Sequence, residues 1–164
     1  MTNRLDDPKQ VKLDRMRYAK NALSSRLTYL AILFNVLYFV SIYESDVGSW
    51  YYSITIGASI VYNLVFMLMT FLASEGVKNY KMGYSVLLLI VGALQIARIF
   101  YLPMQAYQAT VTISKVTYPV MEVPQLTWVI ICLGLSAVCC LAAGIIGAHR
   151  SRTLAAYNAS LNEQ

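Results

Sequence analysis

Long apolar runs alternate with short polar segments along this chain, and four of the runs are long enough to cross a lipid bilayer. They cover residues 27–43, 51–73, 82–102 and 126–148. A membrane-spanning helix needs about 20 mostly apolar residues. No proline lies inside any run, and Pro103, Pro119 and Pro124 fall between the third and fourth, where we expect the helix to stop. The pattern predicts an all-α membrane protein, a four-transmembrane-helix bundle.

The polar segments divide the chain into three parts. We expect a basic N-terminal segment over residues 1–26, a transmembrane domain over 27–149 and a tail over 150–164. The largest connector is the loop 103–125, whose alternating, β-branched stretch QATVTISKVTY predicts a short hairpin. Loops of this length are often functional. The alternative is a lid that simply covers the ends of its own helices.

The N-terminal segment carries a helix-start signal, with Asp7 as N-cap and Pro8 at the first helical position. Its apolar residues recur near helical spacing between basic residues; they are Leu13, Met16, Leu23 and Leu27. This pattern is typical of a cationic helix on the membrane surface, drawn there by anionic lipid. A solvated extension of the first span is the alternative. In the tail, a short weak helix with Leu154, Tyr157 and Leu161 on one side is expected.

Composition agrees with a membrane protein, since 58% of the 164 residues are hydrophobic, 13% are charged and the mean hydropathy is +0.54. The net charge of +5 would suggest nucleic acid as a partner of a soluble protein, but in this chain the positions of the charges matter more. We therefore expect contact with the lipid bilayer and no nucleic-acid partner. All three cysteines lie in the fourth run, which argues against a secreted disulfide framework.

Basic residues set the expected orientation. Eleven of the thirteen Lys and Arg residues lie in 1–26, in the connector after the second run or in the tail, and all three segments fall on one side. Such an excess marks the cytoplasmic side. Trp50 and Trp128 open the second and fourth runs at the opposite surface, where amphipathic rings are favoured. We expect a multi-pass protein of the cell membrane, with both termini cytoplasmic and the loop 103–125 outside.

Several polar residues fall within the apolar runs and are candidate contacts for a partner or a solute. They are Asn35, Ser59, Asn63, Gln95 and Arg98. The alternative for the amides is hydrogen bonding between helices, because lipid offers no partner. For Arg98 the alternatives are an anchor at the membrane edge, a salt bridge to Glu44, Asp46 or Glu122, or a site for an anion or a partner subunit.

The fourth run carries two stripes of small residues, each repeating every four positions. They comprise Ser136, Cys140 and Gly144, and beside them Cys139, Ala143 and Gly147. Small-xxx-small stripes let another helix approach closely. This face is expected either to pack inside the bundle or to dock against another subunit.

Catalytic chemistry is sparse. His149 is the only histidine, no Asp or Glu lies within a run, and no GxSxG, HExxH, P-loop or CxxC motif is present. We therefore expect neither a metal nor a cofactor, and no enzyme. An enzyme acting on lipid is the least favoured hypothesis, because it needs an acid–base pair that the sequence does not offer.

Two functional hypotheses remain. The first is a non-catalytic integral membrane subunit that docks in a larger membrane complex, such as a transporter, together with other membrane protein subunits. Its docking faces would be the fourth helix and the surface with Gln95 and Arg98. The alternative is a small homo-oligomeric carrier or channel for a small solute. Its path would be lined by the polar stripe of the second helix, which includes Ser59 and Asn63.

Overall fold

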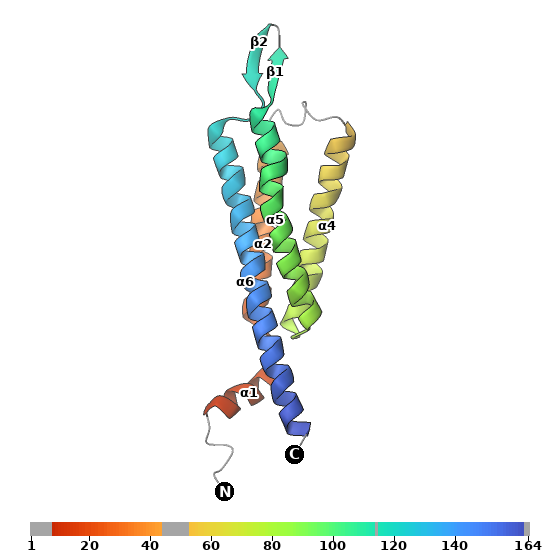
Figure 1. Cartoon of the computed structure of the whole chain (residues 1–164), viewed down its shortest axis with the longest axis vertical. Coiled ribbons are helices and arrows are strands. Elements are labelled where there is room, and N and C mark those ends of the chain that lie inside the picture. The colour runs from red at the N-terminus through yellow and green to blue at the C-terminus, as the bar shows by residue number, and fades with distance from the viewer. Residues whose placement is uncertain (1–7, 44–52, 114, 163–164) are drawn as a thin grey trace.

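The structure is a computed structural model that describes residues 8–43, 53–113 and 115–162. Four of its helices are long and apolar enough to cross a membrane. They are α2 (Ala22–Tyr43), α4 (Ser53–Lys78), α5 (Met82–Gln108) and α6 (Val123–Asn162). These helices run along one another as a bundle (Figure 1). The prediction of four long apolar helices is confirmed, and they fit a multi-pass membrane protein.

A β-hairpin projects from one end of the bundle, which we call the hairpin end (Figure 1). Strands β1 (Thr110–Ile113) and β2 (Val116–Pro119) pair antiparallel, so the hairpin predicted in this loop is confirmed. Lys115 in the turn has a positive φ of 69°, which a tight reversal of the chain requires. Just after β2, Val120 and Met121 are buried in the core, and they fasten the hairpin to the bundle.

Pro103 lies inside α5, so the prediction that the third helix stops before this proline was wrong. A proline in a helix loses one backbone hydrogen bond and costs roughly 3 kcal/mol. Here its neighbours Leu102 and Ala106 are buried beside Met121 in the core of the hairpin end. Burial of this extra turn outweighs the cost of the proline, and the helix continues to Gln108.

The opposite end of the bundle, the terminal end, carries α1 (Pro8–Tyr18) and the last turns of α6 (Figure 1). The described part of α1 starts at Pro8, and the proposed cap Asp7 lies outside the described residues. A break before α2 separates the two helices, so α1 is not a continuation of the first span. The tail does not form a separate short helix, because α6 runs unbroken to Asn162.

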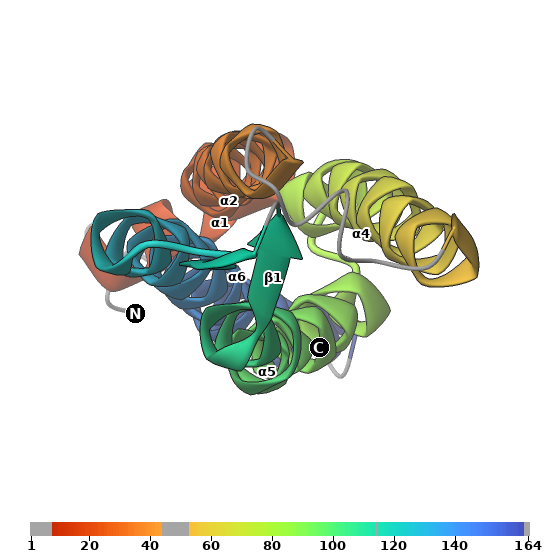
Figure 2. The same cartoon turned by 90° about the horizontal axis from the view of Figure 1, so that it is seen from above.

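Helix α6 is the centre of the bundle. Both α2 and α5 pack along it, whereas α4 packs on α2 and α5 and barely contacts α6. From above, α4 leans away from the other helices toward the hairpin end (Figure 2). Large apolar side chains cover the outer surface, and they include Leu33, Leu64, Leu68, Val138 and Ile145. Such a surface suits contact with the lipid bilayer.

Glycines allow the close approach of α5 and α6. A Cβ atom on Gly144 of α6 would lie 2.9 Å from the carbonyl oxygen of Ser85 and 2.9 Å from Leu89, both on α5. A Cβ atom on Gly92 of α5 would likewise lie 2.8 Å from Leu141 of α6. Two helix backbones can come this near only where a side chain is absent.

We therefore expect Gly144→Ala to destabilise the bundle. The added methyl group would push against backbone of α5, and overpacking of this kind costs about 1–3 kcal/mol. Thermal unfolding in a mild detergent should show a lower midpoint. The matched control is Gly134→Ala on the same helix, where nothing lies within 4 Å of the added methyl group. Equal midpoints for the two variants would contradict the tight α5–α6 contact.

Candidate functional site

Polar residues from all four long helices meet inside the bundle. We call them the interior polar cluster; its members are Asn35 of α2, Asn63 of α4, Gln95 and Arg98 of α5, and Ser136 of α6. Arg98 is 8% exposed and the other four are fully buried. Buried polar groups in an apolar bundle must find partners within the protein. The contacts of this cluster therefore determine how the helices sit against one another.

Gln95 joins three helices. Its Nε2 donates to Oδ1 of Asn35 at 3.0 Å and to Oγ of Ser136 at 3.3 Å. The hydroxyl of Ser136 in turn donates to the carbonyl oxygen of Ala31 at 2.9 Å. Interhelical hydrogen bonds of this kind contribute about 0.6–2 kcal/mol each. In this structure the amides act as braces between α2, α5 and α6.

Arg98 points into the bundle and not toward its surface. Its Nη1 donates to Oδ1 of Asn63 at 2.8 Å. The guanidinium carbon lies 4.5 Å from the ring centre of Tyr38 and 4.7 Å from that of Tyr62. Cation–π contacts are worth about 0.5–2 kcal/mol, the upper values where water is excluded. Two aromatic faces and one amide oxygen therefore stabilise the charge, which argues against an anchor that reaches the membrane edge.

Of the three acids proposed as salt-bridge partners of Arg98, the structure describes only Glu122. Glu44 and Asp46 lie outside the described residues. Among the residues that the structure places, the salt bridge found joins Glu75 and Lys78, and none joins Arg98 to Glu122. Of the three acids offered as alternative partners of Arg98, Glu122 therefore makes no salt bridge with it. Arg98 sits too far inside the bundle, on the face that α5 turns toward Asn63 and not toward the hairpin.

Among the residues that the structure describes, three buried polar atoms of the cluster have no hydrogen-bond partner. They are Nδ2 of Asn35, Oε1 of Gln95 and Nη2 of Arg98. A buried donor or acceptor that stays unpaired costs about 1–3 kcal/mol, and more for a charged group. The guanidinium of Arg98 is therefore held firmly on one side by Asn63 and keeps an unused donor.

An apolar cavity of about 510 Å³ lies beside the cluster, between α4 and α5. Its walls are Ala58, Ser59 and Tyr62 from α4 and Leu94, Ala97, Arg98, Tyr101 and Leu102 from α5. Leu94 and Tyr101 are more than one-third exposed, so the cavity opens on the lateral surface of the bundle. Among its described lining residues, Arg98 is the one charged group. The site thus combines apolar walls with a single buried cation.

The buried members of the polar stripe of α4 are hydrogen-bonded, in part within α4 itself and in part to neighbouring helices. Nδ2 of Asn63 donates to the carbonyl oxygen of Ser59 at 3.0 Å, and Thr70 donates to that of Phe66 at 2.7 Å. The hydroxyl of Ser74 lies 2.8 Å from that of Ser25 on α2. Asn63, Thr70 and Ser74 are fully buried. These contacts use the stripe for helix packing, while Ser59 alone of its described members lines the cavity.

The small-residue face of α6 lies within the bundle. All six of its members are buried, and they are Ser136, Cys139, Cys140, Ala143, Gly144 and Gly147. Gly144 and Gly147 both approach Ser85 of α5. Of the two roles predicted for this face, internal packing is the one that the structure has, and the face is not available to another subunit.

Sequence reasoning missed two features of the site. Tyr38 and Tyr62, which sandwich Arg98, looked like ordinary apolar positions of their helices. A signal for Tyr38 was present, because Ala31, Asn35, Tyr38 and Ile42 repeat at helical spacing and are all buried. A second polar cluster at the terminal end, around Asn21, Ser24 and Ser25, was also missed.

Comparisons with known proteins give no relative. No protein-family model, no curated protein and no solved structure matches this chain significantly. Among the described residues, no three His, Cys, Asp or Glu side chains come together as ligands for a metal.

The contact between Arg98 and Asn63 is testable by a double-mutant cycle with Arg98→Met and Asn63→Leu. We expect a coupling free energy of about 1–3 kcal/mol, because each single variant leaves the other buried group unpaired. The measurement is the free energy of unfolding in a mild detergent.

The control cycle pairs Arg98→Met with Ser74→Ala, since Ser74 bonds Ser25 instead. It lies about 16 Å from Asn63 along α4. This pair should be additive within about 0.5 kcal/mol. Equal coupling in both cycles would rule out a specific bond between Arg98 and Asn63.

Proposed function

We propose that this chain is a non-catalytic membrane subunit, and that it docks a transmembrane helix of another protein in the cavity between α4 and α5. The observation that carries the proposal is Arg98, a buried cation with an unused donor in the wall of an apolar cavity that opens sideways. Intramembrane charges of this kind commonly mark contact sites.

The chemistry of the cavity suits a helix better than lipid alone. Acyl chains fill apolar walls but offer no acceptor to a guanidinium. A partner helix brings apolar side chains for Leu94 and Tyr101 together with a carboxylate, an amide or a free carbonyl oxygen for Arg98. A small rotation of the guanidinium would present Nη2 to that acceptor while Nη1 stays on Asn63.

The position of α4 supports the same docking face. This helix contacts α6 little and leans away from α5 toward the hairpin end (Figure 1). Its outer surface is apolar, with Val61, Leu64 and Leu68 each more than half exposed. The face on α6 proposed from the sequence is occupied within the bundle. The cavity between α4 and α5 therefore replaces it as the docking site.

The carrier or channel hypothesis has less support. Its path was to be lined by the polar stripe of α4, whose buried members Asn63, Thr70 and Ser74 are engaged in hydrogen bonds. A solute path along them would require these bonds to break.

Docking is tested by purification of the protein from its native membrane in a mild detergent, followed by mass spectrometry. We expect a stoichiometric companion chain to co-purify with the wild-type protein. With Ala97→Phe, which fills the cavity, the amount of co-purified companion chain should fall at least about tenfold. The control is Ala93→Phe, which changes another exposed alanine of α5 that does not line the cavity. If the Ala97→Phe variant retains the companion chains, this docking site is excluded. A pure homo-oligomer would also exclude it and would favour the carrier hypothesis.

The proposal also places the protein in the cell membrane with the terminal end cytoplasmic, because the Lys and Arg residues concentrate there. A membrane-impermeant maleimide tests this in intact cells, since the native cysteines are buried. Thr112→Cys in the exposed hairpin should react directly, whereas Ser160→Cys in the exposed tail should react only after permeabilisation. The reverse pattern would contradict this orientation.

A further inference from the structure

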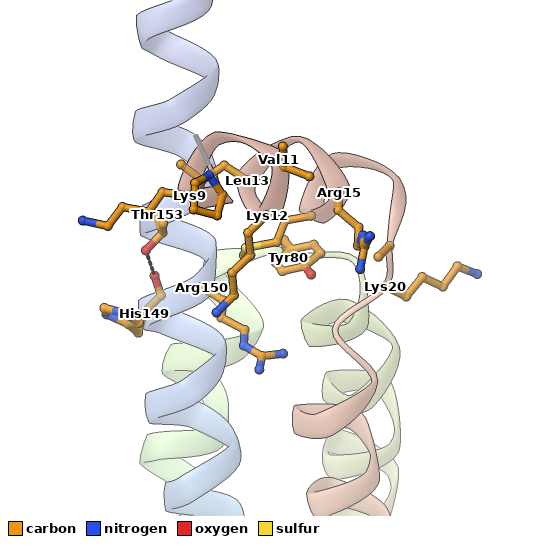
Figure 3. A pocket seen from close by; sticks show the side chains of 13 residues that line it. Lys9, Val11, Lys12, Leu13, Arg15, Lys20, Tyr80, His149, Arg150 and Thr153 are labelled. Atoms are coloured by element: carbon orange, nitrogen blue, oxygen red, sulfur yellow. Dashed lines mark hydrogen bonds between the residues drawn. The ribbon is translucent and has the colours of Figure 1, made fainter. Parts of the chain in front are cut away.

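A second cavity, of about 790 Å³, lies at the terminal end beneath α1 (Figure 3). Residues of α1, the turn between α4 and α5, and α6 line it. It is separate from the docking site, because the cavity between α4 and α5 lies toward the hairpin end. The two sites share no residue.

The charged side chains that line this cavity, among the described residues, are all basic. Five of them are Lys or Arg, namely Lys9, Lys12, Arg15, Lys20 and Arg150. No acidic side chain is among the described residues that line it. The acid of α1, Asp14, is engaged elsewhere, since its carboxylate accepts a hydrogen bond from Tyr157 at 2.7 Å. Lys12, Arg15 and Arg150 bring like charges to the same cavity; like charges repel one another, so an anion bound there would relieve that repulsion.

The cavity has a fixed inner wall. Nη1 of Arg150 donates to Oδ1 of Asn21 at 2.8 Å. Asn21 is fully buried, and its backbone N–H donates to the carbonyl oxygen of Lys78 at 2.9 Å. These bonds hold the guanidinium in place before any ligand arrives. In Figure 3, Lys12, Arg15 and Arg150 point into the space between α1 and the helix ends.

A phosphate group matches this arrangement best. It offers several oxygen acceptors around one centre, which suits cations that arrive from different elements. The planar fork of an arginine pairs with phosphate in a bidentate manner, and the lysine acts as a point charge. Arg150 would supply the fork from α6, and Lys12 and Arg15 would close over it from α1.

The level of the cavity points to the source of the phosphate. The apolar spans end here, since α2 begins at Ala22, α4 ends at Lys78 and α5 begins at Met82. This is the depth of lipid headgroups. Val11, Leu13 and Met16 of α1 also line the cavity and can contact the glycerol and upper acyl region. We infer that this cavity binds the phosphate of an anionic phospholipid headgroup, with Arg150 and Lys12 as its principal ligands.

The test titrates soluble short-chain phosphatidic acid, below its micelle concentration, into the full chain in a neutral detergent. Native mass spectrometry measures the bound fraction. Lys12→Gln and Arg150→Gln should each weaken binding about tenfold, which corresponds to one lost charge-assisted hydrogen bond. The matched control is Arg152→Gln, an exposed arginine two residues further along α6 that does not line the cavity. It should stay within about twofold of wild type.

The test separates a specific headgroup site from binding of free phosphate and from attraction by diffuse surface charge. Short-chain phosphatidylcholine, which has no net charge, should bind at least about tenfold more weakly. If inorganic phosphate displaces the lipid at a concentration equal to that of the lipid, the cavity is a phosphate site, but its ligand is soluble phosphate and not a lipid headgroup. Unchanged binding in Lys12→Gln would overturn the inference even if Arg150→Gln fails to fold. An equal loss in Arg152→Gln would also overturn it, since diffuse surface charge would then explain the binding.

Discussion

The close contact of α6 with α5 and α2 is the constraint on which the rest of this structure depends. It exists because the inward face of α6 is built from serine, cysteine, alanine and glycine, so that α5 and α2 can approach its backbone. That proximity brings Gln95 within hydrogen-bonding reach of both Ser136 and Asn35. If this face carried large side chains, the helices would lie farther apart, and the buried amide of Gln95 would have no hydrogen-bond partner.

The same contact leaves α4 as the least constrained of the four long helices. Because α6 is occupied by α2 and α5, α4 can pack only against the outer sides of those two. At the terminal end it is held by the bond between Ser25 and Ser74 and by the tight turn into α5. Toward the hairpin end the polar contact that spans from α5 to α4 is that of Arg98 with Asn63. The cavity between α4 and α5 is the space that this arrangement leaves open.

How far the sequence predicts this molecule follows from what its patterns encode. Length and hydropathy predicted the four long helices, and the alternation of β-branched residues predicted the hairpin. Periodicity also placed Asn63 and Gln95 on polar faces. Periodicity does not show which helix a given face packs against. The pairing of Arg98 with Asn63 and the aromatic neighbours of Arg98 could therefore not be predicted from the sequence.

Local rules failed where tertiary packing was stronger. Pro103 should end a helix by its own chemistry, yet the burial of Leu102 and Ala106 carries α5 past it. The small-residue face of α6 was equally compatible with internal packing and with docking, because the sequence pattern is the same for both. The choice between them needed the positions of α2 and α5.

Arg98 affects both the stability of the bundle and the docking that we propose. A lone arginine in an apolar bundle is costly, and its partners recover that cost only in part, because Nη2 remains unpaired. Replacing it by an apolar residue of similar length would remove the unpaired charge but would also free Asn63 and the ring of Tyr62 on α4. The charge thus holds α4 at a set distance from α5 and thereby maintains the cavity. Among the described residues no group pairs with Nη2, and the proposed contact with a second helix would use this donor, which a purely structural brace leaves unused.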